Sequence, residues 1–328
     1  MNTRRIVGGL CGLVGAGASA FVAARYRRDI RRARERISAG SRIAETPAGP
    51  VEYAAAGDGP PVLVVHGAGG GFDQAMYLAA PLVDAGLRVV APSRFGYLRT
   101  PLPADASAEA QADAHARLLD ALGIARAAVL GASAGAPSAM QFALRHPERL
   151  AALILLVPAA YPAHVGARPA GAAPEGPPRA TAILFDTALK SDFLFWLAMR
   201  IARRTVHRAI LATPPSVVAH AGPGERARVE GVLERILPIR PRRLGLLNDA
   251  LVTSSLPRYE LERIAAPTLA ISLEDDLFRT WEGARYSAAH IPGARFVGYP
   301  SGGHLWVGHH EELMGEVARF AAAAPTAP

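Results

Sequence analysis

Residues 127–136 read Ala-Ala-Val-Leu-Gly-Ala-Ser-Ala-Gly-Ala, an apolar run that ends in the pattern Gly-X-Ser-X-Gly, and a helix-forming segment follows at 137–146. A strand that turns into a helix at a serine is typical of a nucleophile elbow, whose strained backbone requires small residues two positions before and after the serine. Gly131 and Gly135 meet this requirement. We therefore expect Ser133 to stand clear of the sheet edge, near the positive end of the helix. Because the pattern is common by chance, an ordinary loop without catalytic function is the alternative. A base, an acid and a second oxyanion donor in the right order along the chain would decide for the elbow.

The composition limits the possible architectures and partners. A chain of 328 residues, half of them hydrophobic, can form one large domain with an insertion or two ordinary domains. Its single cysteine, Cys11, excludes an internal disulfide and a cysteine-based metal site. The net charge of +8 is confined to residues 1–42, which hold ten arginines and two acidic residues. The remainder is neutral overall, so we expect no nucleic-acid partner.

The N-terminal segment predicts a membrane anchor. Residues 6–24 carry no charge and are just long enough to cross a bilayer as a helix, although Gly and Ala dominate them. The seven arginines at 25–36 outnumber those at 1–5, so the positive-inside rule places the main body in the cytoplasm. A cleaved signal peptide, with a site at Ala18-Ser19-Ala20, is an alternative that the arginines disfavour. A surface-lying helix and a mistaken start are further alternatives.

The order of elements predicts an α/β fold with a doubly wound, mostly parallel sheet, because apolar strands alternate with helices. The alternation stops at about Pro158 and strand-like runs resume only at 268–272, so the helical segments between them form an insertion. The predicted organisation is an N-terminal anchor with its arginine-rich segment at 1–37, a linker at 38–50, a core at 51–160, a helical cap at 161–261 and a second core part at 262–324.

Two further strand ends carry the side chains that a serine nucleophile needs. One strand is followed by Glu274-Asp275-Asp276, where Asp276 is the predicted orienting carboxylate and Asp275 the alternative. Another is followed by Gly302-Gly303-His304, whose glycines let the loop bring the imidazole over the sheet edge. His304 is therefore the predicted general base. A neutral imidazole accepts the serine proton, while the carboxylate fixes its tautomer and stabilises the imidazolium.

The negative oxygen of a tetrahedral intermediate needs two hydrogen-bond donors. The predicted donors are the backbone N–H of Ala134, directly after the serine, and that of Ala68, in the glycine-rich run 66–71. His66 opens this run, and we expect it to shape the loop rather than act as the base. A phosphate-binding loop is disfavoured, because the chain has no GxxxxGK pattern and its only lysine is Lys190.

The order Ser133, Asp276, His304 is the order of nucleophile, acid and base in α/β-hydrolases. On these parts the sequence resembles the α/β-hydrolase superfamily, in its capped "alpha/beta hydrolase 1" form, over roughly residues 50–324. The resemblance rests on five segments, which are His66-Gly67-Ala68-Gly69-Gly70, Ser93-Arg94-Phe95-Gly96-Tyr97, Gly131-Ala132-Ser133-Ala134-Gly135, Glu274-Asp275-Asp276 and Gly302-Gly303-His304.

Two departures from the family pattern lie around the acid. Leu273 stands where glycine usually opens the turn, which leaves Asp275 and Asp276 in competition. Arg279-Thr280 stands where relatives often carry proline soon after the acid. The cap contains an apolar run at 193–199 followed by arginines, which we interpret as an ordinary cap helix rather than a lid that meets lipid head groups.

The resemblance implies a serine hydrolase, most simply an esterase, that cleaves a carboxylic ester or related acyl compound through an acyl-enzyme on Ser133. It implies a small, apolar acyl substrate between the cap and the serine, with no metal and no cofactor. Dehalogenase and epoxide-hydrolase activities are disfavoured because those relatives use aspartate. Thioesterase, lipase-like, carbon–carbon hydrolase, cofactor-free haloperoxidase and acyltransferase activities stay open. The other class is a catalytically silent binding or scaffold protein at the membrane. The sequence leaves the natural substrate and the oligomeric state open.

Overall fold

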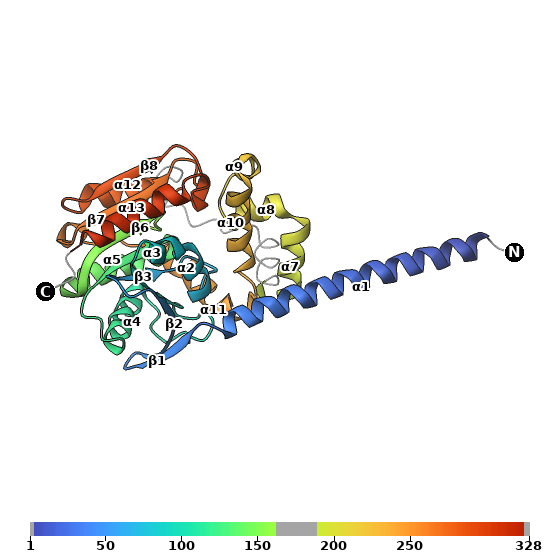
Figure 1. Cartoon of the computed structure of the whole chain (residues 1–328), viewed down its shortest axis with the longest axis horizontal. Helices are drawn as coiled ribbons and strands as arrows, with labels where there is room; N and C mark the ends of the chain where they lie inside the picture. The colour runs from blue at the N-terminus through green and yellow to red at the C-terminus, as the bar shows by residue number, and fades with distance from the viewer. Residues whose placement is uncertain (1–2, 162–188, 325–328) are drawn as a thin grey trace.

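The computed structural model describes residues 3–161 and 189–324, with an eight-stranded sheet at its centre (Figure 1). The strand order is β1-β2-β4-β3-β5-β6-β7-β8. β2 is antiparallel to β1 and β4, and all other pairs are parallel. The predicted mostly parallel α/β sheet is thus confirmed. Its strands are β1 (Arg42–Thr46), β2 (Gly49–Ala56), β3 (Pro61–Val65), β4 (Arg88–Pro92), β5 (Ala127–Ala132), β6 (Leu150–Leu156), β7 (Thr268–Leu273) and β8 (Arg295–Tyr299).

Helices cover both faces of the sheet, because alternate residues of each strand point to opposite faces. Leu63 and Val65 of β3 are buried with α4, α5 and α12, whereas Val62 and Val64 are buried with α2, α3 and α13. Central strands buried on both faces explain the continuous apolar runs in the sequence. These helices are α2 (Phe72–Leu78), α3 (Ala80–Asp84), α4 (Ala108–Ala121), α5 (Ala136–Arg145), α12 (Thr280–His290) and α13 (His310–Ala322).

Between β6 and β7 the described chain is helical and has a core of its own, built on Phe195, Trp196, Val229 and Val232. We call the described residues 189–261 the cap, and its helices follow. They are α7 (Asp192–Ile201), α8 (Arg203–Ala209), α9 (Pro215–His220), α10 (Pro223–Glu234) and α11 (Arg243–Ser254). Residues 162–188, which open the predicted cap, lie outside the described residues. Short 3₁₀ turns are η1 (Ser133–Gly135), η2 (Pro147–Arg149), η3 (Arg240–Arg242), η4 (Leu261–Arg263) and η5 (Gly303–Leu305).

The N-terminal helix α1 (Thr3–Ser38) is continuous, and its second half packs against the cap (Figure 1). Ile30 and Ala33 are buried in the core of the cap. The ring of Tyr26 meets the ring of Trp196 edge-on, with 5.5 Å between centroids. Asp29 accepts hydrogen bonds from the Trp196 indole at 3.0 Å and from Arg200 at 2.8 Å. This part of α1 is therefore an integral piece of the cap.

Arg36, near the end of α1, joins the core to the cap. Its Nε donates to the buried carboxylate of Asp73 on α2 at 3.0 Å. Its terminal nitrogen donates to the carbonyl oxygens of Glu234 at 3.0 Å and Leu237 at 2.6 Å, where α10 ends. A single arginine thus satisfies carbonyls at a helix C-terminus, which the helix itself leaves without partners.

The predicted membrane anchor is wrong. Among the described residues, no helix is long and apolar enough to cross a membrane. Residues 6–24 are rich in Gly and Ala, and the same helix runs on into arginines. The arginines in the second half of α1 have partners in the cap. Arg34 pairs with the Asp192 carboxylate, and Arg36 donates to the carbonyl oxygens of Glu234 and Leu237. The membrane-associated location rested on the anchor and is wrong with it, and the placement of the main body in the cytoplasm loses its basis.

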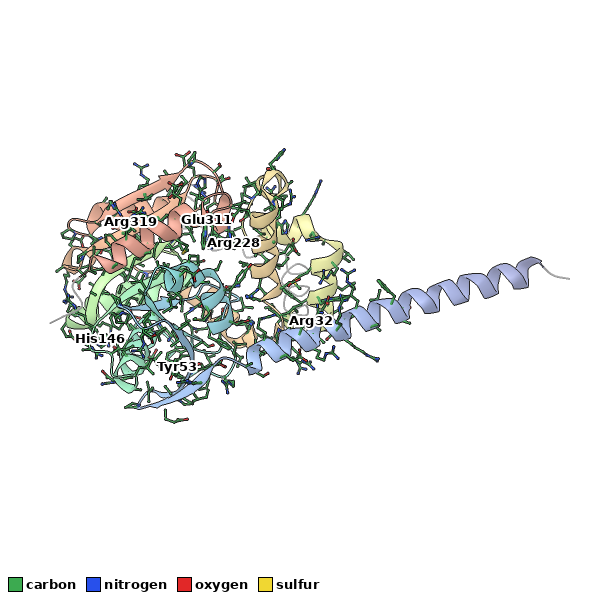
Figure 2. The ribbon with its side chains drawn as sticks, in the orientation of Figure 1. Arg32, Tyr53, His146, Arg228, Glu311 and Arg319 are labelled. Carbon is green, nitrogen blue, oxygen red and sulfur yellow. The ribbon has the colours of Figure 1, made fainter. Side chains whose placement is uncertain are left out.

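We expect Arg36→Gln to lower the free energy of unfolding by about 1–3 kcal/mol, because hydrogen bonds to a buried carboxylate and two carbonyls are lost. Denaturant unfolding of the full chain measures this. The control is Arg32→Gln, on the exposed part of the same helix (Figure 2), which should change stability by less than about 0.5 kcal/mol. Equal effects of the two substitutions would contradict the bracing role of Arg36.

Candidate active site

Ser133 lies in a strained turn between β5 and α5. Its φ of +50° is in the left-handed region, which costs a non-glycine residue about 1–3 kcal/mol. The turn is possible because the residues two positions before and after the serine are glycines. A Cβ on Gly131 would lie 2.6 Å from the Cβ of Ala139, and one on Gly135 would lie 2.5 Å from the carbonyl oxygen of Val65. The sheet and the helix therefore approach each other closely on both sides of the serine.

The structure brings Ser133, His304 and Asp276 together in a chain of hydrogen bonds. The distance from Ser133 Oγ to His304 Nε2 is 2.9 Å, and from His304 Nδ1 to Asp276 Oδ2 it is 2.8 Å. Asp276 is buried and also accepts from the N–H of Phe278 at 2.8 Å and from the Thr280 hydroxyl. Because a carboxylate only accepts, Nδ1 of His304 carries the hydrogen, which leaves Nε2 free to accept the serine proton.

Asp275, the alternative acid, faces the histidine loop instead of the imidazole. It accepts the N–H of Gly302 at 3.2 Å and of Gly303 at 2.7 Å. Both glycines have positive φ, so the loop that carries His304 needs them and is held by Asp275. Neither this role of Asp275 nor the hydrogen bond from the Thr280 hydroxyl to Asp276 was predicted from the sequence. A hydroxyl four residues after a candidate acid was the available signal for the second.

The N–H of Ala134 has a fixed direction. The carbonyl oxygen of Ser133, in the same peptide unit, accepts from Ala159 at 3.0 Å and from the backbone N–H of Ala136. In a trans peptide the N–H points opposite to the C=O, so the N–H of Ala134 points away from these donors. It also lies in the first turn of a helix, where N–H groups lack intrahelical acceptors. Ala134 lines the cavity described below.

The N–H of Ala68 is fixed in the same way through His66. The carbonyl oxygen of Gly67 accepts from His66 Nδ1 at 2.7 Å and from the N–H of Gly70 at 3.2 Å. His66 Nε2 accepts the N–H of Arg94 at 3.0 Å, so the hydrogen is on Nδ1. Burial holds the pKa of His66 well below its usual value and keeps the ring neutral. Both ring nitrogens of His66 are thus bound to backbone groups, and the side chain holds the conformation of the glycine-rich run 66–71, which we call the glycine loop.

A cavity of about 450 Å³ lies over these groups. It touches Ser133, His304, Ala68 and Ala134. Its wall is largely apolar, and much of it comes from the cap, including Phe195, Leu211, Val232, Ile236, Ile239 and Leu246. Within the described chain, no cluster of three or more His, Cys, Asp or Glu could hold a metal ion. The arrangement is suited to a small apolar molecule that presents a polar group to Ser133.

Comparison with known proteins agrees with the fold. The family model for the alpha/beta hydrolase fold matches residues 60–308. This is more than half of the chain, which therefore belongs to the alpha/beta hydrolase fold family.

Individual relatives extend the comparison. A solved alpha/beta hydrolase fold protein from Nakamurella multipartita is 30% identical, with a TM-score of 0.66, over 86% of this chain and 99% of that chain. A thermophilic esterase from Thermogutta terrifontis is 26% identical, with a TM-score of 0.61, over 86% of this chain and 96% of that one. The 2-hydroxy-6-oxo-6-phenylhexa-2,4-dienoate hydrolase of Comamonas testosteroni is 36% identical over 113 residues, which are 33% of this chain and only 40% of that protein.

We expect Gly135→Ala to destabilise the fold by about 1–3 kcal/mol or more, because its Cβ would overlap the carbonyl oxygen of Val65. Denaturant unfolding and thermal melts measure the loss. Gly224→Ala is the matched control, since a Cβ at this helical position meets nothing within 4 Å and should be neutral or stabilising. A Gly135→Ala variant as stable as this control would contradict the close approach at the turn.

Proposed function

We propose that this protein is a serine hydrolase that cleaves a carboxylic ester, or a related acyl compound, through an acyl-enzyme on Ser133. The observation that carries the proposal is the hydrogen-bonded chain from Ser133 through His304 to Asp276, which opens into an apolar cavity. A serine hydroxyl is a weak nucleophile, and this arrangement supplies the base that activates it.

In the proposed mechanism, Ser133 Oγ attacks the substrate carbonyl carbon while its proton passes to His304 Nε2. Asp276 stabilises the imidazolium that forms. The N–H groups of Ala68 and Ala134 donate to the negative oxygen of the tetrahedral intermediate. The intermediate collapses when the leaving alcohol takes the proton from His304. Water, with His304 again as base, then attacks the acyl carbon. The bond from this carbon to Ser133 Oγ breaks, Ser133 takes the proton back from His304, and the acid is released.

The substrate class is proposed from the cavity. Its apolar wall and modest volume favour a small acyl compound, bound between the cap and Ser133, and no step above requires a metal or a cofactor. The similarity to the thermophilic esterase supports an ester as the substrate. Transfer of the acyl group to another alcohol uses the same acyl-enzyme. It would be revealed by more leaving alcohol than free acid among the products, because part of the acyl group ends in a new ester.

A carbon–carbon hydrolase is the second candidate. It is favoured by the similarity to the 2-hydroxy-6-oxo-6-phenylhexa-2,4-dienoate hydrolase, which covers a third of this chain. The same serine and histidine would serve, with a carbanion instead of an alkoxide as the leaving group. Steady-state rates on a p-nitrophenyl ester series and on this dienoate separate the two candidates directly.

Treatment of the full-length protein with a fluorophosphonate probe should label Ser133, because the probe reacts with serines activated by a base. Peptide mass spectrometry locates the label. We expect the label to disappear in Ser133→Ala and His304→Gln. It should persist in Ser138→Ala, because Ser138 is a buried serine of α5 that takes no part in the chain of hydrogen bonds to Asp276. A folded protein without label on Ser133 would refute the hydrolase proposal and favour a silent binding protein.

The two acids should differ sharply in their effect on turnover. Asp276→Asn should lower kcat by about a thousand- to ten-thousand-fold, because the amide stabilises the wrong tautomer of His304. Asp275→Asn should lower kcat by only about tenfold, since its remaining carbonyl oxygen still accepts one loop N–H. Ester hydrolysis by both variants at equal folded concentration measures this, and the reverse ranking would transfer the role to Asp275.

A further inference from the structure

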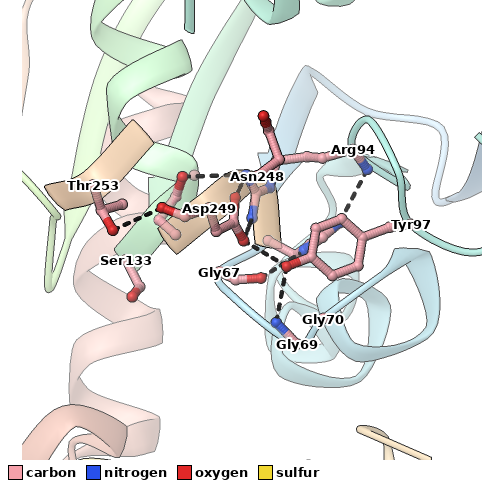
Figure 3. Close-up of polar contacts among 12 residues, drawn as sticks. Gly67, Gly69, Gly70, Arg94, Tyr97, Ser133, Asn248, Asp249 and Thr253 are labelled. Carbon is pink, nitrogen blue, oxygen red and sulfur yellow. Dashed lines mark hydrogen bonds and ion pairs between the residues drawn. The ribbon is translucent and has the colours of Figure 1, made fainter. Parts of the chain in front are cut away.

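A buried ion pair joins the cap to the core beside Ser133 (Figure 3). Arg94, in the loop after β4, donates two hydrogen bonds to Asp249 on α11, at 2.7 Å to Oδ1 and 2.6 Å to Oδ2. Both side chains are buried, and Asp249 lines the cavity. Removing two charges from water is costly, so a buried pair is weak evidence of added stability. Its bidentate form, by contrast, fixes geometry closely.

The same pair reaches the peptides on both sides of the predicted oxyanion hole. A guanidinium nitrogen of Arg94 also donates to the carbonyl oxygen of Ala134 at 3.2 Å. The Tyr97 hydroxyl donates to Asp249 Oδ2 at 2.5 Å and accepts the N–H of Gly69, directly after Ala68, at 3.1 Å. Burial raises the pKa of Tyr97 well above its usual value, so this hydroxyl stays protonated and donates.

Asp249 lines the cavity, but its carboxylate is committed to three hydrogen bonds from the protein. Oδ1 accepts from Arg94, and Oδ2 accepts from both Arg94 and Tyr97. Its carboxylate is also neutralised by the guanidinium. A group held in this way can influence the reaction through the residues that it positions.

We propose that Asp249 of the cap is a positioning residue which, through Arg94 and Tyr97, orients the two backbone donors of Ala68 and Ala134 toward the developing oxyanion. The cap then does more than enclose the substrate, because α11 supplies the carboxylate that links the two segments carrying these donors. The inference rests on the proposed serine-hydrolase function and adds to it a reason for the cap to be present during the chemical step.

Tyr97→Phe is the decisive variant, because it removes the hydroxyl and leaves the Arg94–Asp249 pair in place. We expect kcat on a p-nitrophenyl ester to fall about tenfold while KM changes less than about twofold, since only the transition state needs the oxyanion donors. The Ki of an alkylboronic acid, which forms a tetrahedral adduct on Ser133, should rise by a similar factor. These readouts separate positioning from a general loss of stability, which thermal melting follows.

The matched control is Tyr77→Phe. Tyr77 also runs from a core helix to the cap, where its hydroxyl donates to the carbonyl oxygen of Arg228 at 3.5 Å, but it touches neither Gly69 nor Asp249. We expect its kcat and boronate Ki to stay within twofold of the parent. Asp249→Asn should reproduce the Tyr97→Phe defect, and the double variant should lose less than the product of the two single losses.

A folded Tyr97→Phe protein with the parent kcat and boronate Ki would overturn the inference, as would an equal defect in Tyr77→Phe. If Asp249→Asn fails to fold, the Tyr97→Phe result still decides. Failure of the proposed function looks different, because the parent protein itself would then show no label on Ser133 and no ester hydrolysis.

Discussion

The turn at Ser133 is the constraint on which the remaining structure depends. A serine with φ of +50° is retained only where the surroundings leave the backbone no alternative. Here Gly131 lies against Ala139 and Gly135 against the end of β3, so the sheet and α5 lock the turn from both sides. The hydroxyl, the first N–H groups of the helix and the sheet edge are thereby held in one fixed arrangement. The loop that carries His304 and the glycine loop are held next to this turn by hydrogen bonds of their own, from Asp275 and from His66.

Two buried arginine–aspartate pairs join the core to the cap. One has its arginine in the core and the other has its arginine in the cap. Arg94 of the core pairs with Asp249 of the cap, and Arg242 of the cap pairs with Asp73 of the core. Arg242 is fully buried and also donates to the carbonyl oxygen of Gly70 in the glycine loop. The loop is thus held by fixed dipoles and charges before any substrate arrives, which is the condition for effective stabilisation of an oxyanion.

The parts of the site that follow strand ends could be predicted from sequence, because short apolar runs and adjacent glycines are local signals. The geometry around Ser133 and the proximity of His304 to Asp276 belong to this group. Contacts between segments far apart in the chain could not be predicted. Arg94 and Asp249 are separated by 155 residues, and no pattern in either segment indicates that the two side chains form a pair. The N-terminal arginines misled for the same reason, since composition alone does not reveal whether a cationic helix meets lipid or protein.

The seating of α1 on the cap has a consequence for the order in which the chain can assemble. The helix is synthesised before the cap, and Trp196 and the carbonyl oxygen of Leu237 lie 167 and 201 residues beyond the side chains that bind them. Ile30 and Ala33 therefore have no apolar cover until most of the polypeptide has left the ribosome. Domains usually fold from the N-terminus during synthesis, but α1 can dock only after the cap has been made. Until then its apolar side chains stay exposed and can bind chaperones.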